Sequence, residues 1–277
     1  MWRKLSLQAK LMVIASSFIV CLIGWISFEE WSGRSYHSNK TIPKEGFWGP
    51  VTSNLDWCEE NYSVTYWIAE LYNSLSSLFI CASALLSYFL HLKKYSKISW
   101  SFKVLYFNVF MVGFGSVLFH ATLKRWTQML DELPMLFASL SYLYIMNTKN
   151  HDHSPLTFCL HFNAAVLATW LEICLPEHPE FLQLVFLGIL LYDIYLGFRL
   201  VSEGNHNLKA NAERGLGISA LAAVVWMTEP LICQNYSWLH LHSWWHFLSS
   251  LGCFFLIILL QDAYGQTPPR KEINKLV

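Results

Sequence analysis

The chain has 277 residues, of which 54% are apolar, 16% are aromatic and only 14% are charged, with a mean hydropathy of +0.33. An average soluble domain is roughly 25% charged, so a soluble fold of this length would lack the charges to cover its surface. The high apolar content excludes a disordered chain, the zero net charge argues against a nucleic-acid partner, and together they predict a multi-pass membrane protein.

Eight stretches approach the length of about 20 apolar residues that a membrane-spanning helix needs. The first stretch stands apart and follows Arg3, Lys4 and Lys10, which is typical of a signal anchor or a cleavable signal peptide. Because no clear small-residue cleavage site follows, an uncleaved anchor is favoured. The expected fold class is an all-α membrane protein, a seven-transmembrane helix bundle with one additional N-terminal transmembrane helix. The predicted spans are residues 11–28, 64–90, 104–121, 129–146, 156–175, 181–199, 215–233 and 244–261.

The distribution of Lys and Arg predicts the orientation of the bundle. With the N-terminus in the cytoplasm, fourteen of the 19 Lys and Arg residues fall on the cytoplasmic side, and so does the C-terminus. Cys58 and Cys233 fall on the lumenal side, where oxidation is permitted, and we expect a disulfide, although each could be a small buried apolar residue. The expected divisions are an anchor or signal peptide (1–28), a lumenal segment (29–63), a seven-helix domain (64–262) and a cytoplasmic tail (263–277).

Several polar residues fall at one depth near the lumenal ends of the predicted spans. Ser116 and His120 close the third span, Asp131 opens the fourth together with the adjacent Glu132, and His242 and His246 open the eighth. Residues four apart share a helix face, so His242 and His246 can bind one metal ion, and His120 would complete a three-histidine site with one open position. The simpler interpretation of the histidines is that they form hydrogen bonds between packed helices. The simpler interpretation of Asp131 and Glu132 is that they begin a helix, where the helix dipole favours acids.

A second polar cluster precedes the second span. Asp56, Glu59 and Glu60 lie close to Asn61 and Glu70 with few basic residues nearby, and such acids repel one another unless a cation lies among them. These oxygens, with the carbonyl of Trp57, are ligands of the kind that calcium prefers. The alternative is a solvated acidic loop with Glu70 at a helix start, where the helix dipole favours a negative charge.

These motifs resemble the alkaline ceramidase family over residues 45 to about 262. The resemblance rests on Gly46-Phe-Trp-Gly-Pro50 with the acidic segment that follows, on Gly115-Ser-Val-Leu-Phe-His120, on Gln128-Met-Leu-Asp131-Glu-Leu-Pro134, on residues 226–233 and on His242-Ser-Trp-Trp-His246. It implies a multi-pass intramembrane hydrolase of the endoplasmic reticulum or Golgi. Such an enzyme, an N-acylsphingosine amidohydrolase, cleaves the amide of ceramide to sphingosine and a fatty acid with its active site toward the lumen.

Carried over by position, the resemblance implies a role for each of these residues. Zn²⁺ would be bound by His120, His242 and His246, with Ser116 and Asp131 as catalytic residues beside it. Ca²⁺ would be bound by Asp56, Trp57 (through its carbonyl), Glu59, Asn61 and Glu70, and the disulfide would join Cys58 and Cys233.

Two features depart from the family pattern. The extra first span lies outside the usual core, and Glu229 stands where the family usually has Asp, which puts any supporting role of that carboxylate in doubt. The alternative function is a seven-helix lipid-binding receptor with the same zinc fold and little turnover, because a fold alone does not fix a function. The partners expected are ceramide and membrane lipid, and the oligomeric state and acyl-chain preference stay open.

Overall fold

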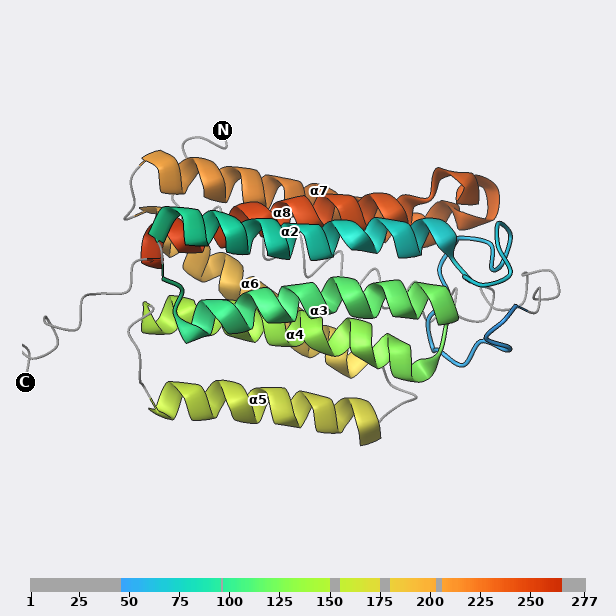
Figure 1. The fold of residues 1–277 in the computed structure, drawn as a ribbon, viewed down its shortest axis with the longest axis horizontal. Coiled ribbons are helices and arrows are strands. Elements are labelled where there is room, and N and C mark those ends of the chain that lie inside the picture. The colour runs from blue at the N-terminus through green and yellow to red at the C-terminus, as the bar shows by residue number, and fades with distance from the viewer. Residues whose placement is uncertain (1–45, 96, 150–154, 175–179, 203–205, 266–277) are drawn as a thin grey trace, which may run out of the picture. The chain divides into compact units, whose positions relative to one another are not determined.

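The computed structural model describes residues 46–95, 97–149, 155–174, 180–202 and 206–265. The predicted first span, residues 11–28, and nearly all of the expected tail lie outside the described residues. The described part is helical and contains no strand, as the sequence predicts. Figure 1 shows long helices running alongside one another, with the segment before α2 gathered at the end where α2 begins and α3 ends.

The helices match the last seven predicted spans in order, with ends that differ by up to nine residues, the largest difference being the start of α7 at His206 where residue 215 was expected. Five of them are long and apolar enough to cross a membrane, namely α2, α3, α6 (from Leu184), α7 and α8. The helix α4 carries Asp131 and Glu132, which lower its mean hydropathy. The helices are α2 (Leu71–Tyr95), α3 (Trp100–Thr122), α4 (Arg125–Thr148), α5 (Pro155–Cys174), α6 (Glu180–Ser202), α7 (His206–Tyr236) and α8 (Leu241–Tyr264), with a short 3₁₀ turn η2 (Ser237–Leu239) before α8.

The start of the second predicted span is wrong. The sequence predicts a helix from residue 64, whereas α2 begins at Leu71. The backbone before Leu71 does not continue the helix but bonds to α3. The N–H groups of Ala69 and Glu70 donate to the carbonyls of Ala121 and His120 at the end of α3. These bonds satisfy carbonyls that the last turn of a helix leaves without partners, and they hold Glu70 beside His120.

Glycines allow the closest helix contacts near the site. A Cβ on Gly115 of α3 would lie 1.9 Å from the carbonyl oxygen of Leu130 in α4, and a Cβ on Gly113 would lie 2.6 Å from the backbone nitrogen of Cys81 in α2. Small residues at such positions let helix backbones approach closely, which is the usual way that membrane helices pack. The three helices are therefore held together just before the turn that carries Ser116.

The segment before α2 packs over the end of α3. Leu123 has a left-handed backbone (φ 50°), and its carbonyl accepts hydrogen bonds from the N–H groups of Thr52 and Ser53. Tyr62 and Ala69 of this segment form a small apolar cluster with Phe119 and Leu123. The predicted disulfide is present: Cys58 is bonded to Cys233 of α7, with their Cα atoms 5.4 Å apart. The segment is thus fixed to two helices that border the site.

Candidate metal centre

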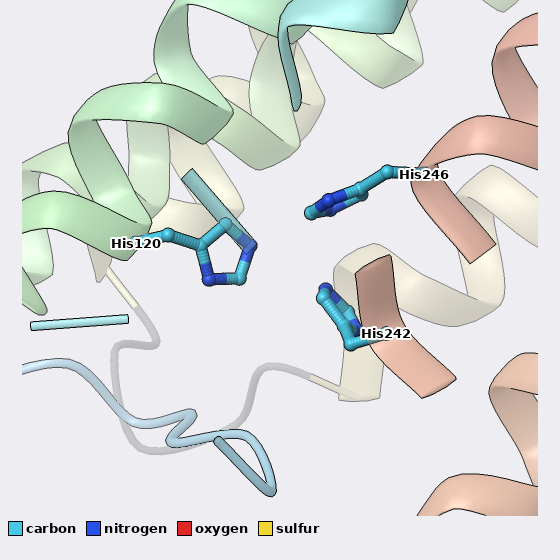
Figure 2. Close-up of side chains that lie close together, drawn as sticks. All are labelled: His120, His242 and His246. Carbon is cyan, nitrogen blue, oxygen red and sulfur yellow. The ribbon is translucent and has the colours of Figure 1, made fainter. Parts of the chain in front are cut away.

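Three buried histidines meet at the end of the bundle where α8 begins. His120 comes from α3, and His242 and His246 come from consecutive turns of α8. One nitrogen from each ring lies within 4.8 Å of the others, and all three residues are at most 2% exposed. Figure 2 shows the three rings turned toward a common centre. The structure therefore brings together the three residues that the spacing singled out, and the group could hold a metal ion.

Each imidazole is held from behind through Nδ1. Nδ1 of His120 lies 2.5 Å from Oε2 of Glu70, and Nδ1 of His242 lies 3.1 Å from Oε2 of Glu229. Nδ1 of His246 lies 2.8 Å from Oγ of Ser76. Carboxylates behind metal-binding histidines fix the tautomer and the ring orientation. Because Nδ1 is engaged in each ring, Nε2 is the nitrogen that could bind a metal ion, and Nε2 of His120 is buried without a hydrogen-bond partner.

Of the other two residues expected at the reacting centre, Ser116 lies beside His246 and Asp131 lies beside Ser116. Oγ of Ser116 is 3.4 Å from Nε2 of His246 and 3.0 Å from Oγ of Ser77 in α2. Asp131, which is partly buried at the close contact between α3 and α4, interacts with the hydroxyl of Ser116. A carboxylate, a hydroxyl and three imidazoles thus share one small region, which suits hydrolytic chemistry on a polar group.

Glu229 connects the disulfide to the metal centre. Its Oε1 accepts a hydrogen bond from the backbone N–H of Cys58 at 3.2 Å, while Oε2 faces His242. The ring of His242 is also stacked on the indole of Trp57, with centroids 3.9 Å apart. The sequence left the effect of the longer side chain open. In the structure Glu229 reaches both partners, so a carboxylate is retained behind His242.

The acidic segment is largely buried, so a solvated loop is the wrong description of it. Glu59, Asn61 and Glu70 are 3%, 7% and 0% exposed. Both oxygens of Glu59 accept hydrogen bonds from the first turn of α2, from the N–H groups of Tyr72 and Asn73. Burial nevertheless raises the pKa of the Glu59 carboxyl to about 7. A cation beside Glu59 would offset this cost of burying its charge.

The expected calcium ligands form a connected group of oxygens. The amide of Asn61 donates to both carboxylate oxygens of Asp56, at 3.2 and 3.3 Å, and its own Oδ1 is buried without a partner. Oε1 of Glu70 accepts the N–H of Trp57 at 3.1 Å. Among the residues that the structure describes, the three histidines are the one group of His, Cys, Asp or Glu side chains whose ligand atoms converge closely enough to hold a metal ion.

Sequence reasoning missed the polar face of α2. Asn73, Ser76 and Ser77 are buried. The hydroxyl of Ser77 donates a hydrogen bond to the backbone carbonyl of Asn73 at 2.8 Å. The side chain of Asn73 links Glu70 to Ser243 at the start of α8. A signal was available, because these residues follow Glu70 at intervals of three and four and share one helix face in an otherwise apolar span.

The fold and the site together define a membrane-type helical bundle with a buried three-histidine centre. The family model described as Ceramidase matches residues 49–272, and the chain belongs to this family. It is 28% identical over 235 residues to alkaline ceramidase 3 of Mus musculus, covering 78% of this chain and 86% of that protein. It is 30% identical over 264 residues to alkaline ceramidase YPC1 of Saccharomyces cerevisiae, covering 82% and 81%. Alkaline ceramidase of Arabidopsis thaliana is 27% identical over 238 residues, covering 81% and 91%.

Proposed function

We propose that this protein hydrolyses the amide bond of ceramide within the membrane and releases sphingosine and a free fatty acid. The observation that carries the proposal is the set of three buried imidazoles, each held at Nδ1 and each with one ring nitrogen close to those of the other two. The names of the relatives, all alkaline ceramidases, support this activity over the receptor function.

The residues suit zinc at this centre. Three neutral nitrogen donors with room for one further ligand are the usual set of a catalytic zinc ion, and the unpartnered Nε2 of His120 is a buried atom that such an ion would satisfy. Bound zinc would polarise the amide carbonyl and lower the pKa of a water molecule toward about 7. An amide is a poor electrophile, so this chemistry is what the reaction needs.

Asp131 and Ser116 are the catalytic residues in this proposal. The carboxylate of Asp131 accepts a proton from the attacking water and later delivers it to the nitrogen of the leaving amine. The hydroxyl of Ser116 donates a hydrogen bond to the carbonyl oxygen as negative charge develops there, a contribution typically of about 3–4 kcal/mol. The hydroxyl of Ser77, 3.0 Å away, helps to fix the position of Ser116.

The membrane arrangement is part of the same proposal. We place all seven described helices across the bilayer, with the three histidines at the lumenal end and the C-terminus in the cytoplasm, because most Lys and Arg residues then face the cytoplasm. Residues 1–28 would be an N-terminal anchor, 29–63 a lumenal segment, 64–262 the hydrolase domain and 263–277 the tail. The membrane would be that of the endoplasmic reticulum or Golgi, and ceramide would enter sideways from the lipid.

Calcium is the second ion that we propose. Asp56, Glu59, Asn61 and Glu70, with the carbonyl of Trp57, offer hard oxygen ligands, of which those of Glu59, Asn61 and Glu70 are buried. The unpartnered Oδ1 of Asn61 and the raised pKa of Glu59 support a cation there. Its effect would be to fix the segment between the end of α3 and the start of α2.

The activity is tested with purified full-length protein, a ceramide substrate and elemental analysis of bound zinc. We expect His242→Ala to abolish hydrolysis and to lower zinc content. His240→Ala is the matched control, because His240 lies two residues away and packs on Tyr72 outside the three-histidine group. Near wild-type hydrolysis and zinc content in His242→Ala would overturn the proposal. An intact zinc site that binds ceramide without turnover would favour the receptor instead.

A further inference from the structure

A groove lies at the end of the bundle opposite the three histidines. It has a volume of about 400 Å³ and is formed by the last turns of α2 and α8. Its residues are spaced three and four apart on each helix, so each set occupies one helix face. The lining residues are Leu90, Lys93 and Lys94 from α2 and Ile258, Gln261 and Asp262 from α8.

The charges of the groove leave one cation available. Lys94 is paired with Asp262, with 2.6 Å between Nζ and Oδ1, and the other oxygen of Asp262 accepts from the amide of Asn211 at 3.0 Å. Lys93 is exposed and has no acidic partner among the described residues. The groove therefore carries a net positive charge at its rim, while Leu90 and Ile258 contribute apolar surface to its lining.

The wall of the groove is held in place by buried hydrogen bonds. The amide of Gln261 donates to the carbonyl of Ser87 at 2.8 Å and to the hydroxyl of Tyr106 in α3 at 2.9 Å. The same hydroxyl lies 2.7 Å from Nδ1 of His91. These contacts join α2, α3 and α8 behind the groove, so a ligand would meet a surface that is already formed.

We propose that this groove binds an anionic phospholipid of the surrounding bilayer. The acyl chain would lie on Leu90 and Ile258, and the phosphate would pair with Lys93. Lysines at the end of a membrane span lie at the level of the lipid headgroups, and basic pockets between such helices suit anionic headgroups. The lining combines an apolar surface and a cation, which complements a lipid and offers little to a free anion. The proposal does not depend on the hydrolase activity.

The test uses full-length protein in phosphatidylcholine nanodiscs with and without phosphatidylserine, with retained lipid measured by native mass spectrometry. We expect phosphatidylserine to be retained selectively and Lys93→Gln to weaken its binding about five-fold, the effect of one lysine at a charged membrane surface. Lys209→Gln is the control, since Lys209 is an exposed lysine near the start of α7 and outside the groove.

A second pair of variants tests the apolar surface. Leu90→Trp should fill the groove and reduce lipid retention, whereas Leu86→Trp, one turn earlier on α2 and also exposed, should not. Equal retention of phosphatidylcholine, equal losses in the Lys93 and Lys209 variants, or equal losses in the two Trp variants would each overturn the proposal. Competition by inorganic phosphate as strong as that by the lipid would overturn it too, because it would indicate an anion site.

Discussion

Oε2 of Glu70 lies 2.5 Å from Nδ1 of His120, and both side chains are fully buried. Glu70 also accepts the backbone N–H of Trp57 through its other oxygen and an amide hydrogen of Asn73. One carboxylate therefore connects the acidic segment with a histidine of the three-histidine centre. Any substitution of Glu70 should therefore alter both the acidic segment and the position of His120.

Glu70→Gln should weaken metal binding. Three donors face the two oxygens of Glu70, and glutamine offers a single oxygen acceptor, so at least one contact is lost. Loss of a carboxylate behind a metal-binding histidine typically lowers metal affinity by about 10- to 100-fold. The measurement is a zinc titration against a competing chelator. Glu60→Gln, a change in an exposed acid of the same segment, should have wild-type affinity.

Glu229→Gln should weaken the metal centre through the tautomer of His242. The amide oxygen of glutamine can still accept the N–H of Cys58, and its NH₂ group then donates to Nδ1 of His242. The ring proton would be moved to Nε2, which could no longer bind a metal. We expect zinc content and ceramide hydrolysis to fall together.

Glu229→Asp tests whether the length of the side chain matters separately from its negative charge. Aspartate keeps the charge and loses a methylene, so it should preserve only one of the two contacts and give an intermediate loss of zinc affinity. Wild-type zinc affinity in both variants would show that Glu229 does not support His242.

Gly115→Ala should separate α3 from α4. The added methyl group would lie 1.9 Å from a backbone carbonyl oxygen, which cannot rotate away. Ser116 and Asp131 face each other across this contact, so we expect hydrolysis to fall by more than ten-fold together with the thermal unfolding midpoint. Gly217→Ala is the matched control, because nothing lies within 4 Å of its added Cβ. There alanine should be neutral or slightly stabilising, since glycine costs about 0.5–1 kcal/mol in a helix. Equal effects of Gly115→Ala and Gly217→Ala would contradict a role of the close contact between α3 and α4 in positioning Ser116 and Asp131.

Asp56→Asn tests the calcium site more cleanly than a change at Glu70. The carboxylate of Asp56 accepts hydrogen bonds from the amide of Asn61 in the same segment, whereas the carboxylate of Glu70 also supports His120 of the three-histidine centre. Asp56→Asn removes one ligand charge, so calcium should raise the thermal unfolding midpoint of the variant less than that of the wild type. Without calcium the two proteins should unfold at similar temperatures. An unchanged response to calcium in the variant would argue against calcium at this segment.

The sequence by itself determined the helical class of the fold and singled out the three histidines that the structure brings together. Apolar stretches of sufficient length predict the helices, and polar groups at one end of several spans stand out because the membrane interior makes them costly. His242 and His246 share a face by their spacing alone. The pairing of Cys58 with Cys233 followed from their expected positions on the lumenal side.

Only the tertiary structure decided what lies behind each ligand. Ser76, Glu229 and Glu70 support His246, His242 and His120 in turn, and each lies on a different helix or loop from its histidine, so no spacing within one helix reports these contacts. The start of α2 at Leu71 was also decided this way, because Ala69 and Glu70 bond to the end of α3 instead of extending the helix. Hydrophobic periodicity reports which residues are buried, but hydrogen-bond partners depend on how the helices meet.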